Sequence, residues 1–204
     1  LPVVVALAAL AGACSSDAAT DDAAPSTSRT EAATSTTEDR SDAPAQTITV
    51  FRSGDDGYDP FRIPAVVAAA DGTLLAFAEG RSSSPSDAGD VDLVLRRSTD
   101  GGRTWGDLEV IGADGANFVG NPSPVVDEES GRVVLLATHK DGQDDELEIL
   151  TGSGVDSSRV WLLTSDDGGA TWGEPEDITA DVKPAEGRWY AVGPGHAIQL
   201  RHGR

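Results

Sequence analysis

The chain has 204 residues, a formal net charge of −20 and an isoelectric point near 4.2. This acidity argues against nucleic acids and anionic membrane surfaces as partners, because both bind through basic patches. The single cysteine, Cys14, excludes an internal disulfide. The sequence has no zinc-binding, P-loop or dinucleotide-binding pattern, so we expect no metal and no cofactor.

The first residues are apolar. Residues 1–13 read LPVVVALAALAGA, which is too short to span a bilayer and is typical of a secretory signal peptide over residues 1–14. The small residues before the cysteine also resemble a bacterial lipobox, with Cys14 lipidated. Ordinary cleavage and lipidation both remain open, and both predict a secreted or cell-surface bacterial protein. Methionine is absent, so we expect the natural N-terminus to lie upstream.

Residues 15–46 consist of small, polar and acidic residues with proline, without an aromatic or long aliphatic side chain. Such a segment cannot bury enough apolar surface to offset the entropy of ordering the chain. We therefore predict a disordered linker over residues 15–46.

From residue 47 onward, short apolar runs alternate with turn residues, which predicts an all-β fold without sustained helices. The sequence S-x-D-x-G-x-T-W occurs at residues 98–105 and 165–172, and each copy precedes the last run of a set of about four. Two similar sets at this spacing indicate antiparallel sheets of a β-propeller. The expected strands are residues 47–51, 63–70, 74–78, 92–97, 108–111, 123–126, 132–138, 159–164 and 175–178, with a third set beginning at residues 197–200.

Arg62 lies in an apolar run, Phe61-Arg62-Ile63-Pro64. A guanidinium in such surroundings is costly to desolvate unless it is paired with an anion. Asp87 follows in a polar loop after the strand end Phe77-Ala78-Glu79-Gly80-Arg81. Arginine presents a planar fork of donors that suits a carboxylate, so Arg62 is a candidate carboxylate-binding residue.

The Arg-Ile-Pro motif, the Glu-Gly-Arg strand end, Asp87, the two Asp-boxes and the run from Val192 to His196 occur in an order that resembles the sialidase (neuraminidase) family. The resemblance runs from about Thr49 to the last residue. It implies a six-bladed β-propeller of which this chain supplies two blades and the start of a third. We therefore expect residues 47–204 to be the N-terminal part of a longer propeller that is marginally stable alone.

The resemblance also implies roles. Arg62 would be the first of three arginines that bind the sialic acid carboxylate, and Asp87 would be the general acid/base, with Asp90 and Asp92 as rivals. Sialidases use a tyrosine nucleophile, because a carboxylate nucleophile would be repelled by the carboxylate of the substrate. Arg81, Asn121 and Glu146 would contact the sugar. The alternatives are an Arg81–Glu79 ion pair, a turn at Asn121 and a solvated loop at Glu146, whose acidic residues are weak candidates for a cation site.

By the order of the family, the nucleophilic Tyr, its activating Glu and two further arginines come after the third blade begins, and neither Tyr58 nor Tyr190 fits that place. The resemblance implies an exo-α-sialidase that releases terminal α-linked sialic acid from glycoproteins, glycolipids and oligosaccharides with retention; these 204 residues alone would be inactive. Two alternatives remain: a non-catalytic Asp-box propeller that binds carbohydrate or protein, and a trans-sialidase or intramolecular lyase.

Overall fold

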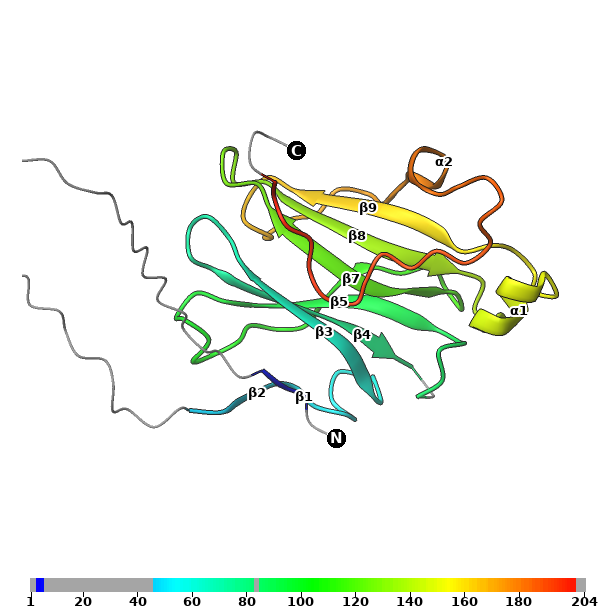
Figure 1. Ribbon diagram of the computed structural model, residues 1–204. Helices are drawn as coiled ribbons and strands as arrows, with labels where there is room; N and C mark the ends of the chain where they lie inside the picture. Colours follow the sequence, from blue (N-terminus) through cyan, green and yellow to red (C-terminus); the bar gives the residue numbers. More distant parts are fainter. Residues whose placement is uncertain (1–2, 6–45, 83–84, 201–204) are drawn as a thin grey trace, which may run out of the picture. The chain divides into compact units, whose positions relative to one another are not determined.

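The computed structural model describes residues 3–5, 46–82 and 85–200 (Figure 1). The chain divides into one compact unit of residues 1–5 and 48–204 and a second of residues 6–47. Only the first is described here. Cys14 and almost all of the predicted leader and linker lie outside the described residues, so those assignments stay predictions. No helix in the described part of the chain is long and apolar enough to cross a membrane.

Two antiparallel four-stranded sheets, which one parallel bridge links into a continuous eight-stranded sheet, form the body of the described unit, as the repeated sequence pattern predicts (Figure 1). The first sheet runs β3-β4-β5-β6 and the second runs β7-β8-β9-β10 in chain order. The strands are β1 (Val3–Val5), β2 (Ile48–Phe51), β3 (Phe61–Ala68), β4 (Leu74–Arg81), β5 (Val91–Ser98), β6 (Glu109–Gly112), β7 (Phe118–Val126), β8 (Val133–Lys140), β9 (Arg159–Ser165) and β10 (Glu176–Asp177).

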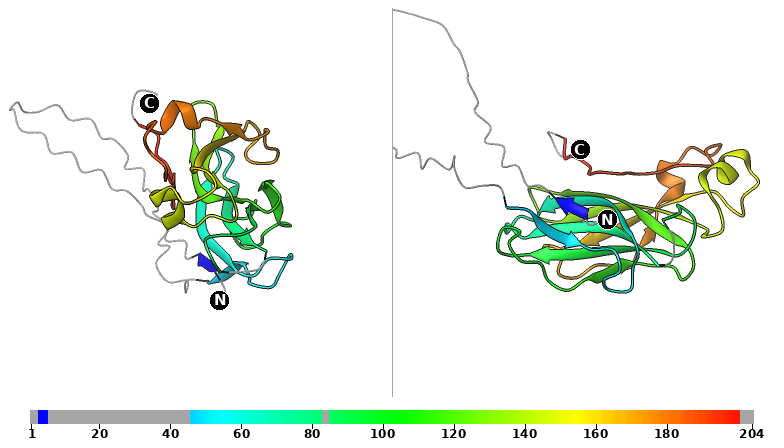
Figure 2. Two further views of the ribbon diagram at one scale, coloured as in Figure 1. Left: turned by 90° about the vertical axis from the view of Figure 1, so that its right-hand side faces the viewer. Right: turned by 90° about the horizontal axis from the view of Figure 1, so that it is seen from below.

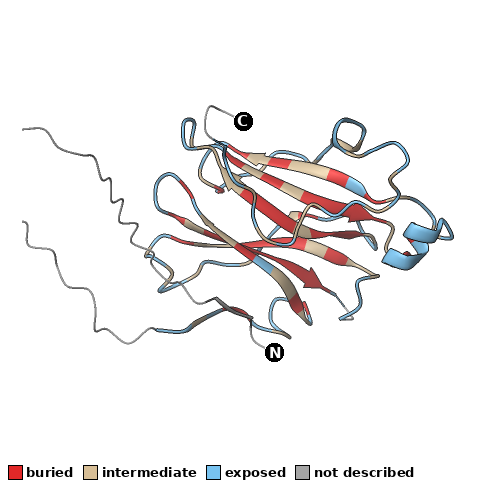
Figure 3. Ribbon diagram, in the orientation of Figure 1, coloured by how far each residue is buried: buried red, intermediate tan, exposed pale blue. Residues whose placement is uncertain are grey.

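We call the two sheets the first and second blade, and we call β3 and β7, the first strand of each, their inner strands. A single parallel bridge, Val91 to Phe118, joins β5 to β7. The strand β2 pairs with β1 and adds its apolar side chains to the other face of the first blade. Both faces of the first blade are thereby covered, and every residue of β4 after Leu74 is buried (Figure 3).

Alternate residues of β4 supply two separate cores, because successive side chains of a strand point to opposite faces. Leu75 and Phe77 face the second blade and pack with Leu135 and Leu163, among others. The intervening Ala76 and Ala78 face β2. The near-continuous apolar sequence of this strand follows from burial on both faces.

The two Asp-boxes form the same turn. In each, the aspartate accepts hydrogen bonds from the backbone and hydroxyl of a threonine four residues later: Asp100 from Thr104 at 2.9 and 2.6 Å, and Asp167 from Thr171 at 2.8 and 2.6 Å. The tryptophan that ends the second box, Trp172, packs edge-on against Phe77 of the first blade, with ring centroids 5.8 Å apart. Both boxes therefore stabilise turns.

The only helices among the described residues are the short α1 (Glu146–Thr151) and α2 (Thr179–Val182), in agreement with the predicted absence of sustained helices. One expectation was wrong. Residues 197–200 form no strand; one backbone hydrogen bond, from Ala197 to Pro124 at 3.0 Å, ties this segment to β7. One backbone hydrogen bond is too few to form a strand pairing. Figure 2 shows the C-terminal segment as an extended stretch alongside the sheets.

Candidate active site

A β-bulge interrupts the inner strand of each blade at the same place. In β3 the pairing with β4 shifts between Arg62 and Ala65, and in β7 the pairing with β8 shifts between Gly120 and Ser123. The residue before proline has a positive φ of 53° in both, at Ile63 and at Asn121. Asparagine tolerates this left-handed conformation, whereas a β-branched isoleucine there is strained. A bulge re-aims side chains, and both face one cavity.

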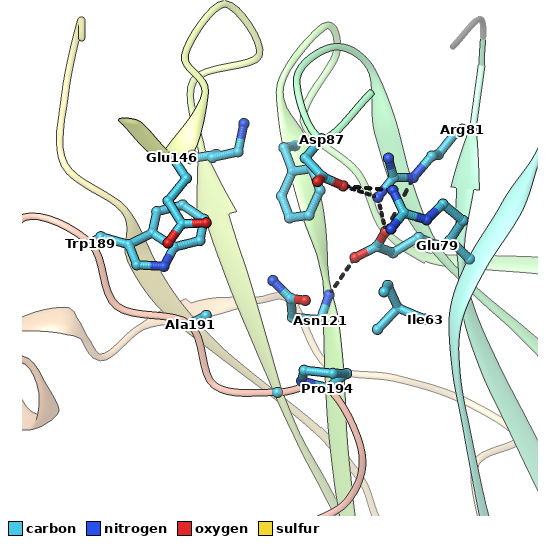
Figure 4. Close-up of a pocket in the computed structure, with 13 residues that line it drawn as sticks. Ile63, Glu79, Arg81, Asp87, Asn121, Glu146, Trp189, Ala191 and Pro194 are labelled. Carbon is cyan, nitrogen blue, oxygen red and sulfur yellow. Dashed lines mark hydrogen bonds and ion pairs between the residues drawn. The ribbon is translucent and has the colours of Figure 1, made fainter. Parts of the chain in front are cut away.

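This cavity, of about 250 Å³, lies where the inner strands, the loop after β4 and the C-terminal segment meet. Figure 4 shows Glu79, Arg81 and Asp87 on one side, Glu146 and Trp189 on the other, and Asn121 between them. The full lining consists of Arg62, Ile63, Glu79, Arg81, Asp87, Phe118, Asn121, Lys140, Glu146, Trp189, Ala191, Gly193 and Pro194.

Asp87 is held by two arginines. Its Oδ1 accepts a hydrogen bond from Arg62 Nη1 at 2.9 Å and another from Arg81 Nη2 at 2.8 Å. Both guanidinium groups also donate to the Pro85 carbonyl, at 3.0 and 2.8 Å. The aspartate loop is therefore folded down onto the two arginines, with Arg81 buried and the Asp87 side chain 69% exposed.

The charge of Asp87 follows from this setting. Burial would raise the pKa of Asp87, but the hydrogen bonds and positive charges of Arg81 and then Arg62 outweigh it and lower the pKa below its ordinary value. The carboxylate is therefore ionised in the unliganded protein at neutral pH. Of the rival loop aspartates, Asp92 accepts a hydrogen bond from the Tyr58 hydroxyl at 2.6 Å, and neither Asp90 nor Asp92 lines the cavity.

Glu79 joins the two blades beneath the cavity. The side chain is 1% exposed; its Oε2 accepts from Arg81 Nε at 3.2 Å and from Arg81 Nη2 at 2.5 Å. Its Oε1 accepts from the backbone N–H of Asn121, across the blade boundary, at 2.9 Å. The bulge in β7 leaves that N–H without a ladder partner, and Glu79 satisfies it.

The acidic run on the other side of the cavity places its three side chains in different settings, with Asp144 buried and both Asp145 and Glu146 exposed. Asp144 is buried and accepts backbone N–H groups of Val155 and Asp156 at 2.8 and 3.2 Å. Asp145 caps helix α1 in a capping box with Glu148. Glu146 begins the helix and lines the cavity. No group of three or more His, Cys, Asp or Glu side chains is arranged to hold a metal ion among the described residues.

All five predicted site residues, Arg62, Arg81, Asp87, Asn121 and Glu146, line this one cavity. For Arg81, the sequence left open an ion pair with Glu79 or a place in the pocket. The structure has both the ion pair with Glu79 and a contact with Asp87. Lys140 and Trp189 also line the cavity but were not predicted from the sequence, and Glu79 was predicted only as an ion-pair partner of Arg81. The sequence does contain a feature that could have identified Glu79. It is an acidic residue in an apolar strand, two positions before Arg81, and this spacing places both side chains on the same face of the strand.

Comparison with known proteins identifies the family. The family model described as a BNR repeat-like domain matches residues 72–204. The chain belongs to this family. The propeller predicted from the sequence is confirmed: this BNR repeat-like chain builds two blades of a sialidase-type β-propeller.

The relatives of this BNR repeat-like protein are sialidases. An exo-alpha-sialidase of Aspergillus fumigatus is 37% identical over 163 residues, which cover 72% of this chain and 40% of that protein. The solved Hadza microbial sialidase Hz136 is 30% identical with a TM-score of 0.68, over 79% of this chain and 35% of that one. An intramolecular trans-sialidase of Ruminococcus gnavus has a TM-score of 0.62 over 72% of this chain and 54% of that one; at 17% identity this shows a common fold alone.

Proposed function

We propose that the protein to which this chain belongs is an exo-α-sialidase that releases terminal α-linked sialic acid with retention of configuration. The observation that carries the proposal is the Asp87 carboxylate held at 2.9 Å by Arg62 and at 2.8 Å by Arg81 on the edge of a sugar-sized cavity. The site already binds one carboxylate, and a sialic acid presents another on its anomeric carbon.

In this proposal Arg62 binds the carboxylate of the substrate. Arginine suits that role because its rigid fork of donors matches a carboxylate and stays charged. The incoming carboxylate competes with Asp87 for the same donors. Asp87, released from Arg62, has a higher pKa and takes up a proton from solvent. It then donates this proton to the leaving oxygen and later removes a proton from the attacking water.

Arg81, Asn121 and Glu146 hold the sugar ring in the same proposal. Arg81 is fixed by Glu79, and Asn121 by the bulge, so both side chains start near their working positions. Glu146 approaches from the start of α1 on the opposite side (Figure 4). The nucleophilic tyrosine, by resemblance to the family, is not among these 204 residues. The substrates would be sialylated glycoproteins, glycolipids and oligosaccharides, reached by an exported or Cys14-anchored protein.

The deciding experiment uses the product of the intact reading frame with a fluorogenic aryl α-sialoside and with 3′-sialyllactose. Turnover that falls by roughly two or more orders of magnitude in Asp87→Ala, with the larger loss on sialyllactose, supports both the activity and the acid/base role. Release of an anhydro sugar or transfer to lactose would identify the lyase or trans-sialidase alternative. Ligand binding without turnover by the folded intact protein would favour the non-catalytic propeller.

A further inference from the structure

Three basic side chains, Arg62, Arg81 and Lys140, line the cavity that contains Asp87, which we call the active-site cavity. Both arginines form ion pairs with Asp87. Lys140 is 1% exposed, and within the described part of the chain its ammonium forms no ion pair with a carboxylate. A buried charge without a counterion is costly. An anion that moves within this cavity is therefore attracted to Lys140.

The ammonium of Lys140 also has hydrogen-bonding capacity to spare. It donates to the Asp144 carbonyl at 2.5 Å and lies 4.9 Å from the centre of the Phe118 ring. An ammonium carries three N–H donors, and this carbonyl is the one oxygen acceptor that it reaches among residues 46–82 and 85–200. Buried polar groups are normally satisfied, so a further oxygen acceptor from the cavity would complete the set.

The charged groups around Lys140 indicate which carboxylate can serve. Burial lowers the pKa of Lys140; the charges of Asp144 and then of Asp87 oppose this effect, Arg81 adds to it, and Asp141 opposes it. Asp144 is buried and already bonded to the backbone of the loop after α1. Asp141 lines the neighbouring cavity and not this one. Of these carboxylates, Asp87 is the one in the wall of the active-site cavity.

Asp87 can change its partner without losing all its contacts. Its Oδ1 accepts the hydrogen bonds from both arginines, whereas its Oδ2 accepts none from the residues that the structure describes. The side chain is 69% exposed, so neighbouring atoms do not block its rotation. One oxygen of Asp87 is therefore available to a second cation while the other remains with Arg81.

The strand register places Lys140 and Arg81 in one row across the two blades. Arg81 faces Val91 on β5, Val91 faces Phe118 on β7, and Phe118 faces Lys140 on β8. Residues that face each other on paired strands project to the same side of a sheet. Arg81, Phe118 and Lys140 accordingly all line the active-site cavity. Lys140 thus lies on the same wall of the cavity as Arg81, a present partner of Asp87.

The backbone segments that carry Asp87 and Lys140 are bonded to each other. Gly89, two residues after Asp87, donates its N–H to the carbonyl of Gly142, two residues after Lys140, at 2.7 Å. The two segments therefore stay together when the side chain of Asp87 changes its partner.

We propose that Lys140 is a positioning residue for Asp87: when the substrate carboxylate binds Arg62, Oδ2 of Asp87 turns to the ammonium of Lys140, which holds the acid at the leaving oxygen. The proposal rests on the proposed sialidase function. Asp87 carries the proton on one oxygen and accepts an N–H of Lys140 with the other. When the bond between the anomeric carbon and the leaving oxygen breaks, its electron pair goes to that oxygen, which takes the proton. The nucleophile bonds to the anomeric carbon, and the Asp87 carboxylate left behind faces Lys140.

This arrangement has a signature in the pH dependence of the reaction. A neighbouring cation favours the ionised form of a carboxyl group, so Lys140 keeps the pKa of substrate-bound Asp87 lower than it would otherwise be, although it is higher than in the free protein. The alkaline limb of the kcat profile, where the bound acid loses its proton, reports this pKa. Removing the charge of Lys140 should therefore move the limb to higher pH.

The test uses two uncharged variants of the intact protein with 3′-sialyllactose as substrate. Lys140→Met keeps the length and apolar stem of the side chain, and Lys140→Gln also keeps a donor for the Asp144 carbonyl. In both, the alkaline limb of kcat should move up by about one pH unit. The kcat at the optimum should fall roughly tenfold, because the acid is weaker and less well held. Damage to the fold alone does not extend activity to higher pH.

Two further variants are controls. Lys140→Arg keeps the charge and should keep the limb at its wild-type position. Lys183→Met removes a lysine that lies outside the active-site cavity and donates to the Ser157 hydroxyl at 2.9 Å. It should also leave the limb unchanged.

An alkaline limb that stays in place or moves to lower pH in Lys140→Met and Lys140→Gln would overturn the positioning role. If the limb stays in place and free sialic acid binds more weakly, Lys140 contacts the substrate directly. Turnover of a fluorogenic aryl sialoside by the wild type separates these results from failure of the proposed function, in which the wild type turns over neither substrate.

Discussion

Asp87 occupies the guanidinium that a substrate carboxylate would need: its Oδ1 lies 2.9 Å from Nη1 of Arg62. The same oxygen is 2.8 Å from Nη2 of Arg81. The two arginines are thus already paired with a carboxylate of the protein itself. Under the proposed function, the carboxylate of the ligand replaces that of Asp87 at Arg62. The free energy of binding is therefore smaller than an unpaired Arg62 would provide.

The first prediction concerns this exchange. Asp87→Ala should bind free sialic acid more tightly than the wild type, by roughly two- to tenfold, because the competing pairs are partly exposed and such pairs are worth up to about 1 kcal/mol each. Titration calorimetry on the intact protein measures the affinity. Asp107→Ala, which changes an exposed aspartate outside the cavity, is the control. Weaker binding by Asp87→Ala would show that Asp87 assists binding instead of competing.

The second prediction concerns the uptake of protons when the ligand binds. Arg81 and Arg62 together hold the pKa of Asp87 below its ordinary value. When the ligand carboxylate neutralises Arg62 and displaces Asp87, that pKa rises, so binding takes up protons between the free and bound pKa values. The observed binding enthalpy at acidic pH should therefore depend on the ionisation enthalpy of the buffer, with the sign of proton uptake. Asp87→Asn should lose this dependence; an equal dependence in the variant would assign the proton to another group.

Much of the fold could be predicted from the sequence because the strands alternate and the Asp-boxes recur. The inner strand β7 shows the limit. Gly120, Asn121 and Pro122 have the composition of a turn, and the predicted strand begins only at Ser123, whereas the structure continues the strand back to Phe118 through a bulge. The sequence near a bulge looks like a chain reversal, because both need glycine, proline and a left-handed residue.

The residues of the site could be predicted in part. The resemblance to sialidases identified side chains that line the cavity, but not the contacts that hold them. Glu79 bonds to the backbone of Asn121, 42 positions away on another blade, and no local pattern encodes such a pair. Trp189 reaches the cavity through an irregular segment without periodicity. Residues brought together across blade boundaries are fixed by packing, which a single sequence does not reveal.

The third prediction tests Glu79 as a positioning residue for Asp87. In Glu79→Gln one oxygen can still accept from Asn121, but the amide NH₂ faces the donors of Arg81, so Arg81 and the Asp87 loop lose their anchor. A misplaced acid matters most for a poor leaving group. We expect kcat/KM to fall roughly tenfold or more on sialyllactose and clearly less on an aryl sialoside.

Glu109→Gln, at an exposed position on β6, is the matched control for Glu79→Gln. Equal losses on the two substrates would indicate general disruption of the site rather than misplacement of the acid. A normal melting temperature with a substrate-dependent loss would support the positioning role.

The fourth prediction concerns Gly120, which lets the blades approach. A Cβ added there would lie 2.5 Å from Glu79 Oε1 and 2.6 Å from the Phe118 ring. Gly120→Ala should therefore lower the free energy of unfolding by about 1–3 kcal/mol, the usual cost of overpacking. Gly106→Ala is the control, because its Cβ would meet its nearest neighbour at an ordinary 3.6 Å. Chemical denaturation compares the two, and equal stabilities would mean that the Glu79 contact relaxes freely.

The fifth prediction concerns the acid stability of the first Asp-box. Hydrogen bonds from the Thr104 hydroxyl and backbone, then from Ser98, lower the pKa of Asp100 to about 2. A folded pKa below the unfolded value means that ionised Asp100 stabilises the fold above about pH 4, and that this contribution disappears as the pH falls toward 2.

Asp100→Asn keeps one acceptor oxygen but turns an NH₂ group toward Thr104. The melting temperatures of the wild type and Asp100→Asn should therefore differ at neutral pH and converge on acidification. Asp107→Asn, an exposed control, should follow the wild type throughout. A gap that persisted undiminished to pH 2 would mean that the variant disrupts the turn sterically rather than through the lost charge.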